Sequence, residues 1–176
     1  MKRAALEHII RAAVAITGAN EIVIIGSQSI LGPVPAPPEE ALRSMDADVF
    51  TFRDPNDAEL IDGSIGEKSA FHESFGYYAH GVSSETAVLP VEWRNRLVRI
   101  ENENTGGGAG LCLDAHDLAV SKLIAGRQKD IEFVEILLQS GHLNNPLISE
   151  RLEKTYLENN LRVLCKSRLQ MINNVG

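Results

Sequence analysis

The chain has 176 residues, of which 44% are hydrophobic and 23% are charged, and its formal net charge is −7. This length and apolar content predict one folded domain with a substantial core, and they exclude a disordered or fibrous chain. The negative charge argues against broad, non-specific binding to nucleic acid, although a local basic patch would be compatible with it.

The two cysteines, Cys112 and Cys165, stand far apart and lack the spacing of a zinc site or a disulfide framework. They therefore favour a reducing, cytoplasmic setting. No apolar run approaches the roughly 18 residues that a membrane-spanning helix needs, so no contact with a membrane is expected. Apolar residues in 2–17 recur at the spacing of one helix face. Glu7 and His8 interrupt the continuous apolar run that a signal peptide needs, so the segment is expected to be an amphipathic helix.

Apolar periodicity and turn residues divide the rest of the chain into short strands and helices. Four prolines mark residues 32–38 as a stiff loop, and the glycine run 105–110 reads as a hairpin. Strands are expected at 21–25, 46–52, 75–82, 96–101 and 111–113. Helices are expected at 2–17, 28–32, 38–44, 57–66, 114–125, 128–139, 147–158 and 160–171.

This order predicts an α+β fold with a mixed sheet of four or five strands and helices on either side. We expect residues 1–140 to form the main domain and residues 141–176 to form a helical extension packed on it. Asp114 is expected to cap the helix that follows it, with Asp117 completing a variant of the capping box.

Two acidic residues on one predicted strand are the first candidate site. Asp46 and Asp48 are two positions apart, so their side chains share one face of the strand, about 6–7 Å apart. This spacing suits a hard divalent cation such as Mg²⁺, which binds a couple of carboxylates and completes its shell with phosphate oxygens and water. Gly26 and Ser27 would add backbone amides and a hydroxyl at the end of a neighbouring strand. The alternative is that the two acids form a solvated strand edge.

A second candidate lies on the predicted helices around residue 126. Lys122 shares a helix face with apolar residues, and Asp130 lies on the apolar face of the next helix. A charge on such a face needs a partner. Lys122, Arg127 and Lys129 are candidates, either for buried salt bridges with Asp130 or for binding phosphate, and the spacing alone does not choose between these roles.

The motifs GSQSILG, SMDADVF and HDLAVSKLIAGRQKD, in this order, resemble the nucleotidyltransferase superfamily. Within it, the chain is similar to the AbiEii/AbiGii-type toxin nucleotidyltransferases. It also resembles an uncharacterised bacterial nucleotidyltransferase-like family whose genes often lie beside genes of the toxin–antitoxin type. The resemblance covers residues 20–140 and includes the stretches FHESFGYYAHGV and TAVLPVEWRNRLVRI.

The resemblance implies a nucleoside triphosphate as substrate, Mg²⁺ as cofactor and transfer of a nucleotidyl group to a hydroxyl. The sequence leaves open whether the acceptor is an RNA, a protein or a small molecule. A toxin-like member of a two-gene module would also have a partner protein encoded by an adjacent gene. The resemblance also implies a role for each matching residue. Gly26 and Ser27 would hold the triphosphate, Asp46 and Asp48 would bind metal, Lys122 would contact phosphate, and Asp130 would orient Lys122 or Arg127.

One part of the pattern departs from the family. Active members have a third carboxylate near the Asp pair, and His80 occupies the expected position on the 75–82 strand. Glu101 is the other candidate for the third metal ligand. Without a third acid, the chain could instead be an inactive nucleotide-binding or protein-interaction module that keeps the fold. Arg94, Arg96 and Arg99 could meet an RNA acceptor, although they also suit a solvated strand face.

Overall fold

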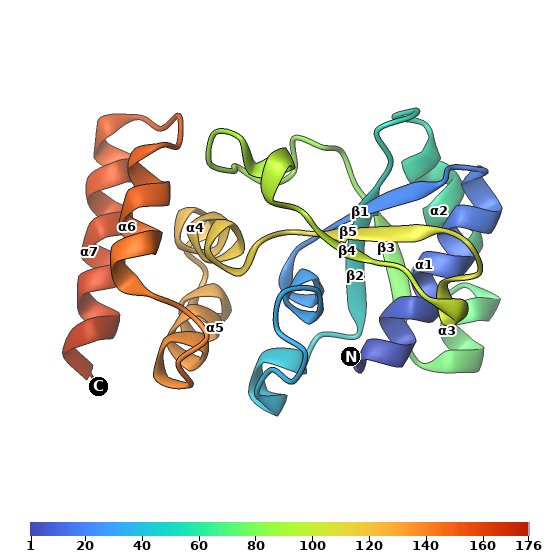
Figure 1. Ribbon diagram of the computed structural model, residues 1–176, viewed down its shortest axis with the longest axis horizontal. Helices are drawn as coiled ribbons and strands as arrows, with labels where there is room; N and C mark the ends of the chain where they lie inside the picture. The colour runs from blue at the N-terminus through green and yellow to red at the C-terminus, as the bar shows by residue number, and fades with distance from the viewer. Residues whose placement is uncertain (176) are drawn as a thin grey trace.

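The computed structural model describes residues 1–175 and contains one mixed five-stranded sheet. Its strands are β1 (Glu21–Ile25), β2 (Asp46–Phe50), β3 (Tyr78–Gly81), β4 (Val98–Ile100) and β5 (Ala109–Cys112). Their order across the sheet is β3-β2-β1-β5-β4 (Figure 1). The β1–β5 and β2–β3 pairs are parallel, whereas β1–β2 and β4–β5 are antiparallel. The predicted α+β fold with a mixed sheet is therefore confirmed.

Helices precede, interrupt and follow the strands. The α-helices are α1 (Arg3–Thr17), α2 (Asp57–Ile65), α3 (Ala70–Phe75), α4 (Ala115–Ala125), α5 (Gln128–Gln139), α6 (Asn145–Glu153) and α7 (Asn159–Val175). Short 3₁₀ helices are η1 (Ser27–Leu31), η2 (Glu39–Leu42), η3 (Trp93–Arg96) and η4 (Glu103–Thr105). The first of these confirms the short helix expected directly after the Gly-Ser turn.

The helices form two groups in Figure 1, with α1 to α3 beside the sheet and α4 to α7 at the other end of the molecule. Helices α6 and α7 pack on α4, and α7 also touches α5. The expected extension, 141–176, thus lies against the preceding helices, with residue 176 outside the described part. The domain boundary at residue 140 stays a prediction. Within residues 1–175, no helix combines the length and the apolar character needed to cross a membrane.

Helix α4 is capped at both of its ends. The Asp114 side chain caps α4 by accepting hydrogen bonds from the backbone N–H groups of His116 and Asp117, as predicted. Gly126 ends α4 with a left-handed φ of 64°. Arg168 from α7 packs against Gly126 and donates a 2.6 Å hydrogen bond to the carbonyl of Leu123.

Two strand predictions began too early. Phe75 belongs to α3, which the strand prediction 75–82 missed, and β3 starts only at Tyr78. Ser69 caps this helix through the backbone N–H of His72, and Gly76 ends it in the left-handed region. Likewise, Arg96 lies in η3, so the predicted strand 96–101 is reduced to β4.

The predicted role of Asp117 in a capping box is wrong. Its carboxylate is fully buried and accepts two hydrogen bonds from Arg96, at 2.8 and 3.1 Å. Arg151 from α6 approaches the same carboxylate at 3.7 Å. The acid therefore joins three parts of the chain instead of capping its own helix.

The three arginines near β4 point to different partners. Arg96 is bound to Asp117, whereas Arg99 pairs with Glu21 and Glu101. Arg94 lies over the ring of Phe52, 4.8 Å from its centroid. They do not form one basic patch, so this segment gives no support to an RNA-binding surface.

Candidate functional site

Two carboxylates on β2 form the acidic side of the site. Asp48 lies between its partners on both neighbouring strands, Ile25 on β1 and His80 on β3. Asp46, two residues earlier, accepts a hydrogen bond from the hydroxyl of Ser44. Burial raises the pKa of Asp48 above its usual range, and the nearby charge of Asp46 raises it further, against the opposing effect of His80 and Lys122. This pair therefore lies in surroundings that favour a bound cation.

The Gly-Ser turn touches this acidic pair directly. Gly26 has a φ of 71°, which favours glycine, and an added Cβ would lie only 2.2 Å from Oδ2 of Asp48. The absence of a side chain at Gly26 thus lets the backbone approach the carboxylate. Ser27, the next residue, begins η1 and lines a cavity beside the two acids.

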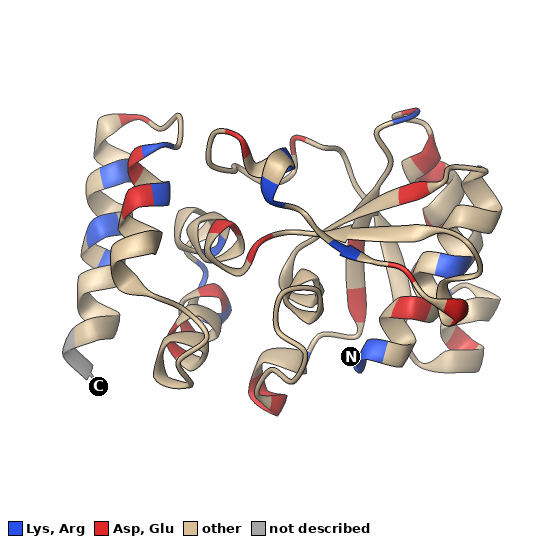
Figure 2. Ribbon diagram, in the orientation of Figure 1, with Lys and Arg blue, Asp and Glu red and all other residues tan. Residues whose placement is uncertain are grey.

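The cavity has a volume of about 550 Å³ and brings together residues from distant parts of the sequence. The acids of β2 and cations from the α4–α5 corner both line it. Figure 2 shows acidic positions on β2 and basic positions around the α4–α5 corner. The predicted residues that line it are Ser27, Asp46, Asp48, His80, Lys122 and Arg127, and Lys129 joins them. The arrangement brings opposite charges to one open space.

A buried carboxylate holds the cationic side. Asp130 is fully buried and accepts hydrogen bonds from Nζ of Lys122, at 2.9 Å, and from Nε of Arg127, at 2.6 Å. Burial alone would raise the pKa of Asp130, but the hydrogen bonds from Arg127 and Lys122 outweigh it and leave the pKa below its ordinary value. Lys122 both makes a salt bridge and lines the cavity, so the two roles considered for it are compatible.

The two candidates for a third metal ligand lie in different places. Nδ1 of His80 is 3.3 Å from Oδ1 of Asp48, and the His80 side chain is 56% exposed. Glu101 follows β4, three strands away from β2, where its carboxylate accepts a 2.6 Å hydrogen bond from Arg99. The structure therefore brings His80, and not Glu101, to the acidic pair.

The two acids fit a magnesium ion whose remaining ligands are phosphate oxygens and water. Within residues 1–175, no group of three or more His, Cys, Asp or Glu side chains is arranged to hold a metal ion alone. Mg²⁺, however, commonly takes one or two carboxylates and leaves its other positions to substrate phosphates and water. Asp46 and Asp48 supply such a pair, next to a space that is lined by cations.

The sequence-based interpretation missed two polar residues that line the cavity, Ser44 and Thr86. Ser44 had a signal in the sequence, because it lies two residues before Asp46 and so points to the same side of an extended chain. Thr86 had none, since it lies in an irregular segment whose path depends on tertiary packing.

Comparison with known families agrees with this geometry. The family described as "Nucleotidyltransferase of unknown function (DUF6036)" matches residues 4–171. The chain belongs to this family. The match confirms the predicted nucleotidyltransferase superfamily, and the finer likeness to AbiEii/AbiGii-type toxins stays a prediction. Searches of curated proteins and of solved structures found no significant match to the chain.

Proposed function

We propose that this protein transfers a nucleotidyl group from a nucleoside triphosphate to an acceptor hydroxyl, with Mg²⁺ as its cofactor. The observation that carries the proposal is the cavity lined by two carboxylates from β2 and three cations from the α4–α5 corner. A metal-bound triphosphate needs both, since its metal binds to acids and its phosphate oxygens bind to cations. Family membership supports the reaction class.

Each group of lining residues has its own part in this proposal. Asp46 and Asp48 would hold the metal, which would screen the charge of the phosphates and polarise them. Ser27 and Gly26 would bind phosphate oxygens through a hydroxyl and backbone N–H groups. Lys122, Arg127 and Lys129 would stabilise the negative charge that moves onto the leaving group.

The transfer step conserves atoms and charge. The acceptor oxygen forms a bond to the α-phosphorus, the bond between that phosphorus and the α,β-bridging oxygen breaks, and pyrophosphate leaves. The proton of the acceptor hydroxyl passes to water at the open side of the cavity, where His80 is exposed. Positioning and neutralisation of charge would supply most of the acceleration.

A toxin-like role, with an RNA or protein acceptor and a partner protein that controls it, is the biological setting that we propose. It rests on the resemblance to toxin nucleotidyltransferases. It predicts that expression of the wild-type protein arrests cell growth and that the Asp46→Asn/Asp48→Asn variant does not. Equal growth of cells that express either protein would contradict this setting without touching the reaction class.

A second candidate is a module that binds nucleotide without transferring it. The observation that favours it is the position of His80, where active nucleotidyltransferases are expected to have a third acid. A neutral imidazole can bind a metal, but it does not replace the charge of a carboxylate.

Labelled nucleotides separate the two candidates. The protein would be incubated with Mg²⁺, heat-treated cell extract and a mixture of nucleoside triphosphates labelled at either the α- or the γ-phosphorus. Nucleotidyl transfer predicts that the α-label joins an acceptor while the γ-label appears in pyrophosphate. The Asp46→Asn/Asp48→Asn variant is the control for other activities in the extract. Binding of nucleotide with no transfer of the α-label would favour the second candidate.

A further inference from the structure

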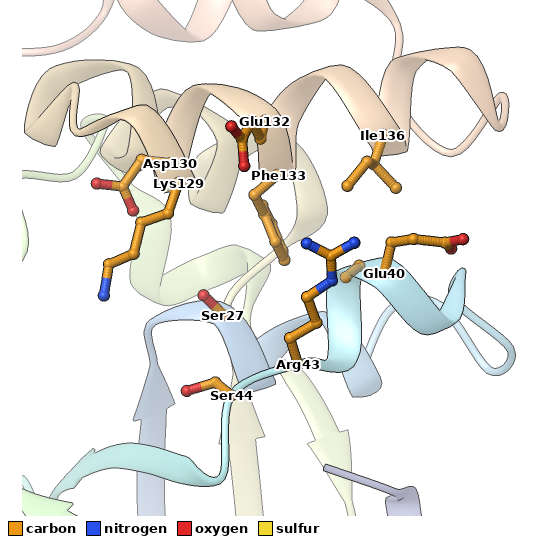
Figure 3. Close-up of a pocket in the computed structure, with 10 residues that line it drawn as sticks. Ser27, Glu40, Arg43, Ser44, Lys129, Asp130, Glu132, Phe133 and Ile136 are labelled. Atoms are coloured by element: carbon orange, nitrogen blue, oxygen red, sulfur yellow. The ribbon is translucent and has the colours of Figure 1, made fainter.

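A second cavity, of about 280 Å³, lies beside the first and shares Ser27, Ser44 and Lys129 with it. It lies between η2 and α5, two elements that are far apart in the sequence (Figure 3). Pockets for whole drug-sized ligands measure about 300–1,000 Å³, so this space suits one part of a ligand whose remainder occupies the larger cavity.

Three of the residues that line this second cavity, Ala41, Phe133 and Ile136, give it an apolar part. Phe133 and Ile136 point from α5 toward the segment that carries Arg43 (Figure 3), and Ala41 closes the space from η2. Phe133 and Ala41 are only 6% and 3% exposed, so the walls belong to the packed core and are well fixed. A narrow space with an aromatic wall suits a flat ring.

Charged groups lie at the rim of the same space. The guanidinium of Arg43 points into the cavity, and it has no hydrogen bond or ion pair with any other residue in the described part of the chain. Glu132 and Glu40 also line the cavity. Glu132 accepts one hydrogen bond, at 3.0 Å, from Gln128, which leaves the carboxylate with further acceptor capacity.

These charges disfavour a phosphate in the second cavity. Three carboxylates line the second cavity, Glu40, Asp130 and Glu132, and they outnumber its two cations, Arg43 and Lys129. They would repel a polyanion, while the larger cavity is lined by three cations, Lys122, Arg127 and Lys129. The triphosphate therefore belongs in the larger space, and the second space is left for the other end of the same nucleotide.

We propose that this second cavity binds the base of the nucleotide and selects guanine. This inference rests on the proposed function, because it assigns the rest of the same substrate. Guanine offers two neighbouring acceptors, O6 and N7, that match the paired donors of an arginine. It also offers the N1–H and N2–H₂ donors, which match a carboxylate such as Glu132. Adenine presents an amino group where guanine has O6, and this donor would face the donors of Arg43.

Calorimetric titration with each of the four nucleoside triphosphates, in Mg²⁺, tests the inference. GTP is expected to bind about tenfold more tightly than ATP, CTP or UTP, because a bidentate contact between one arginine and guanine discriminates against the other bases by about this factor. Arg43→Ala and Glu132→Gln should each reduce this preference to within about twofold, while inorganic triphosphate binds equally to all variants. Glu135→Gln is the matched control, because Glu135 lies on the same helix, accepts from Gln139 at 3.0 Å and does not line the cavity.

The possible failures are distinguishable. Equal affinity for the four nucleotides, or a GTP preference that survives both Arg43→Ala and Glu132→Gln, would overturn the base site and leave the proposed function standing. If neither the nucleotides nor inorganic triphosphate binds to the wild-type protein, the proposed function fails together with the base site.

Discussion

Two fully buried carboxylates on neighbouring helices, Asp117 on α4 and Asp130 on α5, are each approached by two cationic side chains. The cations around Asp117 are enclosed, since the Arg96 and Arg151 side chains are only 17% and 18% exposed. At Asp130, Lys122 is also enclosed, with 10% of its side chain exposed, but the second partner, Arg127, is 62% exposed. The first cluster is closed, and the second opens onto the candidate site.

The difference shows that a buried carboxylate with two cationic partners lies inside the packed structure in one place and at the wall of the candidate site in another. Asp117 connects the segment before β4 with α4 and α6, so its ion pairs hold helices together. Asp130 holds Lys122 and Arg127 at the wall of the cavity, where an anion can reach them. The pKa values differ accordingly. Burial raises the pKa of Asp117 in spite of Arg96, whereas the cations lower the pKa of Asp130.

The largest effect is expected for Asp117→Ala, which would leave Arg96 and Arg151 without their shared carboxylate. Breaking a buried ion cluster in this way costs about 3–5 kcal/mol of unfolding free energy. Urea denaturation measures this loss, with Glu150→Gln on the exposed face of α6 as a control that should change little. If Asp117→Ala unfolds at the same urea concentration as the wild type, the cluster is not structural.

Asp130→Ala should combine a smaller loss of stability with a loss of binding. Arg127 is exposed enough for water to replace the carboxylate, so we expect about 1.5–3 kcal/mol, the contribution of hydrogen bonds to charged groups. Affinity for a nucleoside triphosphate should fall at least tenfold, because Lys122 and Arg127 lose their fixed positions. Asp117→Asn, measured by the same calorimetry, should retain normal affinity. A similar loss in both variants would remove the distinction between the clusters.

Substitution of Gly26 tests the contact between the turn and the acidic pair. Gly26→Ala should cost about 1–3 kcal/mol because its φ of 71° disfavours a side chain. It should also weaken Mg²⁺-dependent binding, since the new Cβ would displace Asp48. Gly18→Ala is the matched control, with a φ of 68° and no atom within 4 Å of the added Cβ. Normal nucleotide affinity in Gly26→Ala would contradict the proposed geometry.

The smallest effect concerns pH in the absence of metal. Because the pKa of Asp48 is raised in the folded protein, folding is favoured when this carboxyl is protonated. That contribution is complete below the ordinary carboxyl value of 3.8 and is lost as the pH rises through the higher folded-state pKa. Asp48→Asn should therefore stabilise the metal-free protein at neutral pH, with a melting temperature above that of the wild type. Asp62→Asn is the control, because Asp62 is an exposed carboxylate on α2. A melting temperature of Asp48→Asn below that of the wild type would contradict the predicted direction of the effect.

The elements that follow from local patterns could be predicted from the sequence. The apolar period of α1, the β-branched run of β1 and the Asp114 cap of α4 all depend on neighbouring residues. The predictions failed where a distant partner decides the outcome. Asp117 looks like a capping residue in its local sequence, but its true partner, Arg96, lies 21 residues earlier. The aromatic run that begins at Phe75 suggested a strand, although capping by Ser69 makes its first part the end of a helix.

Only those residues of the candidate site that belong to local sequence motifs could be predicted. The local motifs pointed to Ser27, Asp46, Asp48 and Lys122, and the fold places all four around one cavity. The space beside Phe133 had no local signal, because it exists only where η2 packs against α5. Opposed surfaces of this kind depend on the path of the chain and not on the spacing of its residues.

The most direct test of the central claim is the calorimetric titration of a non-hydrolysable nucleoside triphosphate with and without Mg²⁺. The account predicts binding by the wild-type protein that depends on Mg²⁺ and is lost in the Asp46→Asn/Asp48→Asn variant. It also predicts that the variant remains folded, since these side chains are partly exposed. Binding that is unchanged by Mg²⁺ or by the double substitution would contradict the role of the two carboxylates, and no binding by the wild type would contradict the site as a whole.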